Sequence, residues 1–319
     1  MLGIPFGFKN SIIIHKHVSV VSSVLSDLSQ WKDWSPWQCM EPECLFNLEG
    51  TKGEEGHKQS WEGERVGSGS FTLIGKTSGS LIYRLETSTP WRSYSQISFS
   101  LKGRGGETIV DWRVKGCVPF TSLLQKMTKS WLENFFDRGL FMLKDFLELG
   151  SLPSRSQYVG VVDRPGFSYI GIRDTCDLVE MSTAMSRDFE VLTVLVEQAK
   201  LPEPDAYLAF YYRYDIVKKR CDYMCVLAYN DPPAVTPDQL KHYKLKSGQV
   251  PSHQSIQVRH IGPYKYLGNA WAMAMREQSL HYYKEDRLVP WYELYLNSPL
   301  NYIPEDLMTE INLPTNIDS

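Results

Sequence analysis

The chain has 319 residues, which is longer than most single domains, so we expect two. Its residues are 42% hydrophobic, 13% aromatic and 22% charged, which excludes a disordered chain. The formal net charge is −3 and no long run of Lys or Arg occurs, so direct binding to nucleic acid is not expected. The N-terminal residues lack the apolar core of a signal peptide or a membrane span. We therefore expect a cytoplasmic protein with no membrane span.

The first half reads as an antiparallel sheet closed by one long helix. Residues 11–20 alternate as in a strand, and 19–30 follow with helical spacing. Gly103-Arg104-Gly105-Gly106 predicts a tight hairpin turn, because glycine accepts a positive φ. Further runs typical of β-strands occur at 58–65, 69–75, 80–86, 94–101 and 108–115, and a helical pattern at 121–149. These patterns predict an α+β domain over 1–150.

Proline and small residues predict a linker over 151–156, followed by a second domain over 157–319. This domain contains a weak internal repeat of strand, helix, strand and strand. The first copy is predicted at 158–173, 182–200, 207–215 and 223–229, and the second at 255–260, 263–281, 290–296 and 308–313. We expect the two copies to pair about a pseudo-twofold axis.

Glu293 is the principal candidate for a functional residue. In a strand, Trp291, Glu293 and Tyr295 share one face, while Tyr292, Leu294 and Leu296 share the other. We expect the leucine face to pack beneath the helices. Burial of the carboxylate between aromatic rings would raise its pKa and suit it to bind a cation or to transfer a proton. The alternative is an exposed glutamate, or one paired with a nearby arginine.

Aromatic residues are candidates for a ligand-binding wall around this carboxylate, with ordinary core packing as the alternative for each. Aligning Tyr211 with Tyr295 in the repeat makes Ala209 the equivalent of Glu293, so only one copy carries the charge. We expect an asymmetric pocket as a result. The proposed ligand-binding residues are Glu293, Trp291, Tyr295, Tyr264, Trp271, Tyr169 and Tyr211.

Other candidate sites are weaker. Glu62 and Glu64 would share a strand face, which more often faces solvent than performs acid-base chemistry. His15 and His17 would share another strand face, but no third metal ligand follows. Gly75-Lys76-Thr77 is similar to the end of a phosphate-binding loop. That motif requires a glycine at position 70, where this chain has Ser70. The six dispersed cysteines indicate neither a disulfide scaffold nor a zinc site. We therefore predict no metal and no cofactor.

The first half resembles the START-like superfamily of polyketide cyclases and lipid-transfer proteins. The resemblance rests on Trp31-x-x-Trp34-x-x-Trp37, on Trp61-Glu62-Gly63-Glu64 with Gly67 and Gly69, on Trp112, and on Gly139-Leu140. It implies a helix-grip fold, in which an antiparallel sheet curls around a long C-terminal helix with a cavity between them.

The second half resembles the GyrI-like effector-binding domain of bacterial multidrug-sensing transcription regulators. The matching residues are His260-x-Gly262-Pro263-Tyr264, Ala270-Trp271, the segment from Trp291 to Pro299 and the segment from Pro304 to Pro314. The resemblance implies that Glu293 lines a ligand pocket. The same two-domain fusion is known in bacterial proteins that often begin with a membrane helix, which this sequence lacks.

We expect a small-molecule binding protein with two cavities for apolar, amphipathic or cationic ligands. Effector sensing would then proceed without a DNA-binding domain of its own, through a protein partner. The alternative is a GyrI-like hydrolase, because some stand-alone relatives open strained cyclopropane-bearing toxins with water. In that case Glu293 would be the catalytic residue that orients or deprotonates the water.

Overall fold

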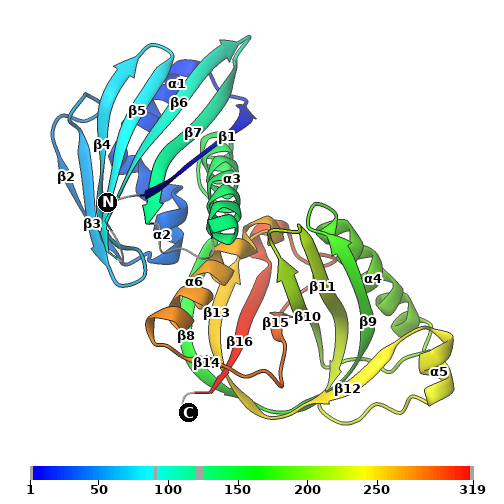
Figure 1. The fold of residues 1–319 in the computed structure, drawn as a ribbon. Helices are drawn as coiled ribbons and strands as arrows, with labels where there is room; N and C mark the ends of the chain where they lie inside the picture. Colours follow the sequence, from blue (N-terminus) through cyan, green and yellow to red (C-terminus); the bar gives the residue numbers. More distant parts are fainter. Residues whose placement is uncertain (1–2, 90–91, 120–124, 317–319) are drawn as a thin grey trace. The chain divides into compact units, whose positions relative to one another are not determined.

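The computed structural model describes the backbone of residues 3–89, 92–119 and 125–316, and side chains within 5–89, 92–117 and 134–316 (Figure 1). The chain divides into two compact units, Met1–Pro153 and Ser154–Ser319. Both are built from an antiparallel sheet with helices, so the α+β class holds for each.

The first unit is a seven-stranded antiparallel sheet in the order β1-β7-β6-β5-β4-β3-β2. Its long helix α3 packs against β1 and the short helix α2. The elements are β1 (Gly3–Ile14), α1 (Val18–Ser26), the 3₁₀ helix η1 (Leu28–Asp33), α2 (Pro36–Met40), β2 (Leu45–Glu49), β3 (Lys58–Gly63), β4 (Gly67–Thr77), β5 (Ser80–Thr89), β6 (Ser93–Arg104), β7 (Glu107–Pro119) and α3 (Gln125–Leu149). The expected helix start at 121 lies outside the described residues.

The turn between β6 and β7 has the predicted tight form. Arg104 pairs with Glu107 in the ladder, so Gly105 and Gly106 are the two central turn residues. Their φ angles are 57° and 93°, a conformation that favours glycine. The glycine pair therefore sets the register of this hairpin.

The first strand ends earlier than the sequence pattern indicates. His17 caps α1, because its Nδ1 accepts a hydrogen bond from the backbone N–H of Ser19 at 3.3 Å. The expectation that His15 and His17 share a strand face is therefore wrong. His15 Nδ1 instead lies 2.7 Å from a carboxylate oxygen of Glu107.

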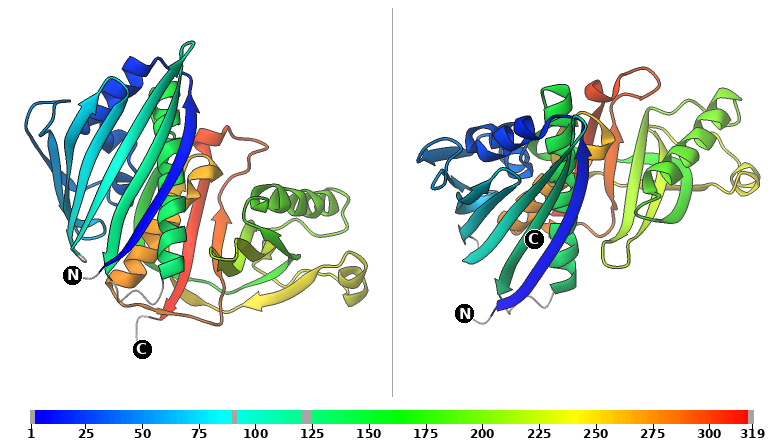
Figure 2. Two further views of the ribbon diagram at one scale, coloured as in Figure 1. Left: turned by 45° about the horizontal axis from the view of Figure 1, so that its top comes forward. Right: turned by 90° about the horizontal axis from the view of Figure 1, so that it is seen from above.

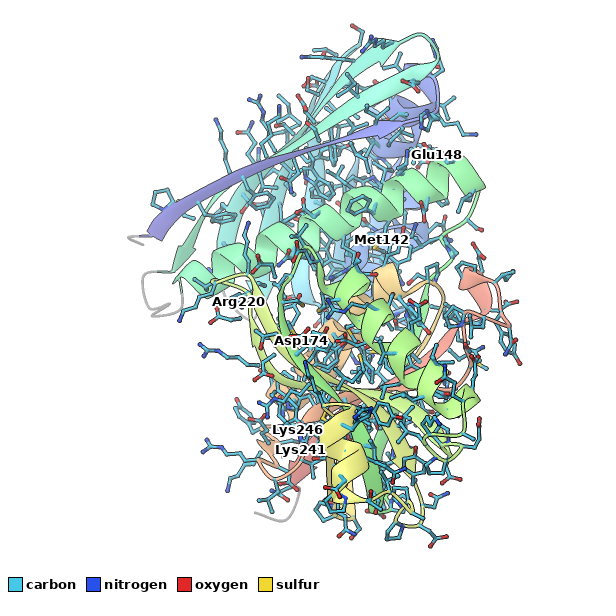
Figure 3. The ribbon with its side chains drawn as sticks, turned by 90° about the vertical axis from the view of Figure 1, so that its right-hand side faces the viewer. Met142, Glu148, Asp174, Arg220, Lys241 and Lys246 are labelled. Atoms are coloured by element: carbon cyan, nitrogen blue, oxygen red, sulfur yellow. The ribbon has the colours of Figure 1, made fainter. Side chains whose placement is uncertain are left out.

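Aromatic residues fill the space between the sheet and its helices. Trp31 lies 4.6 Å from Phe71 and 4.7 Å from Trp34, measured between ring centroids, and Trp112 lies 5.0 Å from Phe136 of α3. Glu148 lies at the far end of α3 (Figure 3). Its carboxylate accepts a hydrogen bond from the His15 N–H at 2.7 Å. This contact joins the last turn of α3 to the segment that follows β1.

The second unit contains a nine-stranded antiparallel sheet. Its elements are β8 (Arg155–Arg164), β9 (Phe167–Asp177), α4 (Met181–Glu197), β10 (Ala206–Asp215), β11 (Arg220–Tyr229), α5 (Pro237–His242), β12 (Lys246–Val250), β13 (His253–Ile261), η2 (Tyr264–Tyr266), α6 (Leu267–Leu280), β14 (Lys284–Glu285), β15 (Trp291–Tyr295), η3 (Pro304–Asp306) and β16 (Met308–Asn316). Because β8 begins at Arg155, the last two residues of the expected linker belong to a strand.

The strand order follows the predicted duplication. It is β12-β9-β11-β10-β15-β16-β13-β8, with β14 beside β16, and the central neighbours β10 and β15 come one from each copy. Helix α4 packs on β9 and β11, whereas α6 packs on β13 and β16 (Figures 1 and 2). The two copies are therefore related by a local pseudo-twofold axis at the middle of the sheet.

The single strand expected over 158–173 is two strands. The break falls at Pro165 and Gly166, where proline removes a backbone donor. A side chain at Gly166 would lie 2.8 Å from the carbonyl oxygen of Val250. The chain therefore turns from β8 to β9 at this point.

Candidate functional site

The central strands β10 and β15 carry the candidate site. Their antiparallel register pairs Tyr207 with Tyr295, Ala209 with Glu293, and Tyr211 with Trp291. Directly paired residues point to the same face, and so do residues two apart along a strand. One continuous row of aromatic side chains thus runs across the sheet, with Glu293 and Ala209 at its centre.

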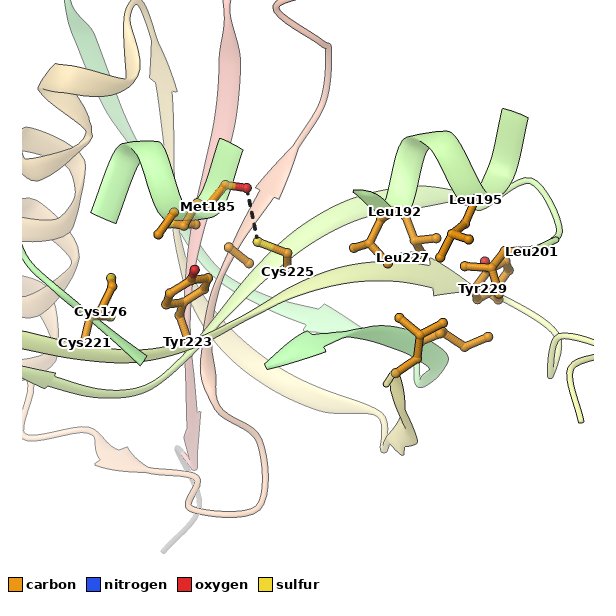
Figure 4. Packing of buried hydrophobic residues seen from close by; sticks show 14 residues of the cluster. Cys176, Met185, Leu192, Leu195, Leu201, Cys221, Tyr223, Cys225, Leu227 and Tyr229 are labelled. Atoms are coloured by element: carbon orange, nitrogen blue, oxygen red, sulfur yellow. Dashed lines mark hydrogen bonds between the residues drawn. The ribbon is translucent and has the colours of Figure 1, made fainter. Parts of the chain in front are cut away.

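This row lies on the face that the helices cover, whereas the sequence pattern predicts that it lies on the opposite face. Tyr207, Tyr211 and Tyr295 pack against the α4 cluster that includes Met185 and Leu192. Figure 4 shows these α4 residues above the sheet, where Cys225 Sγ donates to the Met185 carbonyl oxygen at 3.7 Å. The expectation that Tyr292 and Leu294 lie beneath the helices is therefore wrong.

Tyr292 and Leu294 belong to a cluster on the other face with Leu208, Phe210 and Val289. Phe210 and Tyr292 are almost fully buried there. Both faces of the central strands are apolar. Strand alternation therefore identifies which residues share a face but not which face the helices take.

The Glu293 carboxylate is buried, with 3% of the residue exposed. Its Oε1 accepts a hydrogen bond from Trp271 Nε1 at 2.7 Å, and its Oε2 accepts one from the Tyr295 hydroxyl at 2.7 Å. Burial raises the pKa of Glu293, and hydrogen bonds from Trp271, Tyr295 and Tyr211 offset part of this effect. No cation among the described residues contributes to that pKa shift. The site therefore holds a buried acid without a positive partner.

The adjacent carboxylate Glu310 on β16 shows the opposite arrangement. Arg164 Nη2 lies 2.6 Å from its Oε2, and Arg259 Nη2 lies 2.7 Å from its Oε1. Hydrogen bonds from the two arginines hold the pKa of Glu310 below its usual value despite burial. Glu310 is a structural carboxylate that is already neutralised, which distinguishes it from Glu293.

Aromatic rings flank Glu293 on both sides along the direction of β15. On one side, the Trp271 ring lies 5.4 Å from Tyr211 and 6.0 Å from Trp291. On the other side, the Tyr295 ring lies 5.4 Å from that of Tyr264. Such rings present faces to which a cation or an apolar group can bind.

Tyr264 forms the accessible edge of the group, with 37% of its surface exposed. Gly262 directs the chain to it with a φ of 134°, and its N–H donates to the Leu307 carbonyl oxygen at 2.9 Å. Burial and the nearby Glu293 raise the pKa of Tyr264 to about 12, so its hydroxyl stays protonated. Tyr264 is thus both close enough to Glu293 to sense its charge and partly exposed to solvent.

Six of the seven proposed ligand-binding residues lie together: Glu293, Trp291, Tyr295, Tyr264, Trp271 and Tyr211. Tyr169 does not belong to this group, because it packs on Phe210 at 5.2 Å on the opposite face. Two residues of the group were not predicted, Tyr207 and Phe189 of α4, which lies 5.6 Å from the Tyr295 ring. The repeat could have indicated Tyr207, because it aligns with Trp291.

The paired glutamates of the first unit do not share a strand face. Glu62 lies in β3, but the strand ends at Gly63 and Glu64 belongs to the turn. The backbone N–H groups of Glu64, Arg65 and Val66 donate to the Glu41 carboxylate, each at 2.9 Å. Glu41, which the sequence did not indicate, therefore holds this turn.

Lys76 lies within β4, and its ammonium group donates to the Gly53 carbonyl oxygen at 2.6 Å. All six cysteines are free. Among the described residues, no group of three or more His, Cys, Asp or Glu side chains is arranged to hold a metal ion. No helix in the described part of the chain is long and apolar enough to cross a membrane.

The GyrI-like small molecule binding domain matches residues 159–315, so the second unit contains a domain of this family. No curated protein matches the chain.

Several solved structures are similar to parts of the chain. The EcmrR–DNA complex is 16% identical, with a TM-score of 0.41, over 60% of this chain and 67% of that one. The EcmrR C-terminal domain is 17% identical, with a TM-score of 0.40, over 51% of this chain and 98% of that one. The Aha1 dimer from Colwellia psychrerythraea is 17% identical, with a TM-score of 0.33, over 46% of this chain and 98% of that one.

Proposed function

We propose that the second unit captures an amphipathic, cationic organic molecule on the face between α4 and α6, with Glu293 as its counter-ion. The observation that carries this proposal is the contrast between two buried carboxylates. Glu310 is paired with two arginines. Glu293 instead accepts hydrogen bonds from two neutral donors, Trp271 and Tyr295. A ligand cation would supply the missing charge and stabilise the ionised form of Glu293.

The aromatic rings supply the remaining binding energy. A cation over the face of Trp271 or Trp291 gains a cation–π attraction, which is stronger when water is excluded. The apolar parts of the ligand would replace ring-to-ring contacts such as those of Tyr264 with Tyr295. Because Glu293 is only 3% exposed, entry requires these rings to move, and Tyr264 is the most exposed of the group. Binding would therefore move the aromatic side chains around Glu293, a change that a partner protein could detect.

A fluorescence and thermal-shift screen with lipophilic cations such as tetraphenylphosphonium tests the proposal. We expect wild-type protein to bind at least one such cation and Glu293→Gln to bind it at least about tenfold more weakly, since the buried negative charge that offsets the charge of the ligand is lost. Glu285→Gln is the matched control, because Glu285 is an exposed carboxylate on β14. An equal response from wild type and Glu293→Gln would exclude the proposed counter-ion.

The alternative proposal is a hydrolase that opens strained, electrophilic rings with water. It is supported by the raised pKa of Glu293, which brings a carboxyl group closer to the range useful for proton transfer at neutral pH. The test is turnover of a cyclopropane-bearing electrophile followed by mass spectrometry. Turnover must disappear in Glu293→Gln if this alternative is correct.

For residues 1–150 we propose a START-like helix-grip domain, joined through 151–156 to the domain over 157–319. The seven-stranded antiparallel sheet and the packing of α3 on β1 support this proposal. Limited proteolysis tests the boundary, with cleavage between residues 150 and 156 expected to release two folded fragments. Fragments that are unfolded by circular dichroism would contradict it.

A further inference from the structure

The sheet of the first unit gathers positive charge on the face that points away from its helices. Tyr83, Phe99 and Trp112 are buried on the helix side, so the residues that alternate with them point outward. Strands β1, β7, β6 and β5 lie side by side (Figure 2). Their outward residues include the exposed cations Lys9, Arg84, Lys102, Arg113 and Lys115. These cations come from four separate strands, so no run of Lys or Arg in the sequence reveals them.

The strand register brings these cations close together. Arg113 of β7 pairs directly with Lys9 of β1. Lys115 follows two residues along β7 and pairs with Gln96, which in turn pairs with Arg84 of β5. Neighbouring strands lie about 4.8 Å apart, and alternate residues of one strand lie about 7 Å apart. Each of these cations therefore lies within about 10 Å of the next.

Most of this charge is not neutralised within the protein. Asp111 Oδ2 lies 3.0 Å from Lys9 Nζ and pairs with it. Arg84, Arg113 and Lys115 have no ion-pair partner among the described residues. The outer face therefore carries free positive charge, although the formal net charge of the whole chain is −3. Such a face attracts a partner that presents many negative charges.

The side chains around the cations indicate what kind of anionic partner fits. Ser98 and Gln96 place a hydroxyl and an amide between the charged residues. Ile13 and Tyr94 lie on the same face and are 48% and 67% exposed, and Glu86 pairs with Tyr94 at its margin. Tyrosine is favoured at the level of lipid head groups. Tyr94 is the one exposed aromatic residue in the described part of these strands, so the face lacks the stacking platform that single-stranded nucleic acid requires.

We propose that this outer face binds the surface of a membrane that contains anionic phospholipids. Arg84, Arg113 and Lys115 contact the lipid phosphates, while Ile13 and Tyr94 rest among the head groups. Each Lys or Arg close to such a surface contributes about fivefold to the partition coefficient. The face therefore supports a weak and reversible attachment. The inference is independent of the ligand proposed for the second unit.

Co-sedimentation of the full chain with lipid vesicles tests the proposal. Vesicles of phosphatidylcholine with about one third phosphatidylglycerol should bind the protein at about 0.05 M salt and release it at about 0.5 M, because salt screens the charges. Vesicles of phosphatidylcholine alone should bind it at least about tenfold more weakly. Glu293→Gln should bind both kinds of vesicle as wild type does, which separates this proposal from the one for the second unit.

The double variant Arg113→Gln/Lys115→Gln removes two charges from this face and should weaken binding by about tenfold or more. The matched control is Lys241→Gln/Lys246→Gln, which removes two exposed cations of the second unit and should change binding by less than about twofold (Figure 3). The melting temperature of the first variant should equal or exceed that of wild type, because Arg113 pairs with the like-charged Lys9. A retained melting temperature shows that weaker binding does not reflect unfolding.

Arg84→Gln lies on a different strand and gives an independent measure, with an expected loss of about fivefold. Equal binding to both kinds of vesicle, or equal binding by the two double variants, would overturn the inference. Tighter binding to a single-stranded oligonucleotide than to anionic vesicles at the same phosphate concentration would also overturn it, since nucleic acid would then be the partner of this face.

Discussion

Ala209 lies directly opposite Glu293 in the antiparallel ladder of β10 and β15. The same two residues are equivalent in the internal repeat, so the local twofold axis passes between them. A duplicated domain would place two identical side chains at this point. Here one copy supplies a methyl group and the other a carboxylate, which avoids two buried like charges at one position.

Restoring the symmetry should therefore destabilise the protein. Cross-strand Cβ atoms are about 5 Å apart, so Ala209→Glu would bury two carboxyl groups side by side. We expect a loss of about 3 kcal/mol or more in the free energy of unfolding at pH 8, and a smaller loss at pH 5, because a lower pH favours the protonated, uncharged carboxyl group. Urea denaturation at the two pH values measures the difference. A loss that is equal at both would contradict this account.

Glu293 should give the stability of the protein a characteristic pH dependence. Its folded pKa is raised above the ordinary value of 4.5, so the native state holds a proton that the unfolded state releases. Its stabilising contribution is complete below pH 4.5 and is lost as the pH rises through the folded pKa. Relative to Glu293→Gln, wild type should become less stable over that window. Melting temperatures of both proteins between pH 4 and 8 provide the measurement.

His260 should act in the opposite direction. Burial lowers its pKa from 6.5 to about 4, so the unfolded state takes up a proton that the native state does not. Its contribution is present above pH 6.5 and is lost as the pH falls toward 4, by about 3 kcal/mol in total. Replacement by glutamine, which does not titrate, should flatten this part of the profile. If His260→Gln loses as much stability as wild type when the pH falls from 6.5 toward 4, another group is responsible for the loss.

Glu310 should behave as a structural residue. Its carboxylate joins Arg164 of β8 to Arg259 of β13, so Glu310→Ala leaves two cations without their partner. We expect a loss of about 3 kcal/mol in the free energy of unfolding and unchanged affinity for lipophilic cations. The exposed Glu285 gives the control substitution, Glu285→Ala, with an effect within about 0.5 kcal/mol. Weaker cation binding in Glu310→Ala would show that the two carboxylates are not separate in function.

The sequence predicted the relationships that depend on local periodicity. The shared face of Trp291, Glu293 and Tyr295 follows from strand alternation, and the equivalence of Ala209 and Glu293 follows from the repeat. The orientation of that face did not follow, because Tyr292 and Leu294 make the other face equally apolar.

Other features depend on contacts between distant segments. Tyr169 could not be assigned to a face of the sheet from sequence. Its face depends on two strand registers, that of β9 with β11 and that of β11 with β10. The Glu41 carboxylate accepts hydrogen bonds from the backbone of the turn at residues 64–66. These contacts join segments that no periodic pattern in the sequence connects. The end of β1 was also missed, because the alternating pattern continues through His17, which caps the next helix.

Calorimetric titration with a lipophilic cation in two buffers of different ionisation enthalpy tests the central claim most directly. If Glu293 is the counter-ion, binding below its raised pKa must release a proton, so the apparent enthalpy of wild type should differ between the buffers. Affinity should rise with pH through that pKa and then level off. Glu293→Gln should bind weakly, with no difference between the buffers. Tight binding by wild type with no proton release at any pH between 4.5 and 8, matched by Glu293→Gln, would contradict the account.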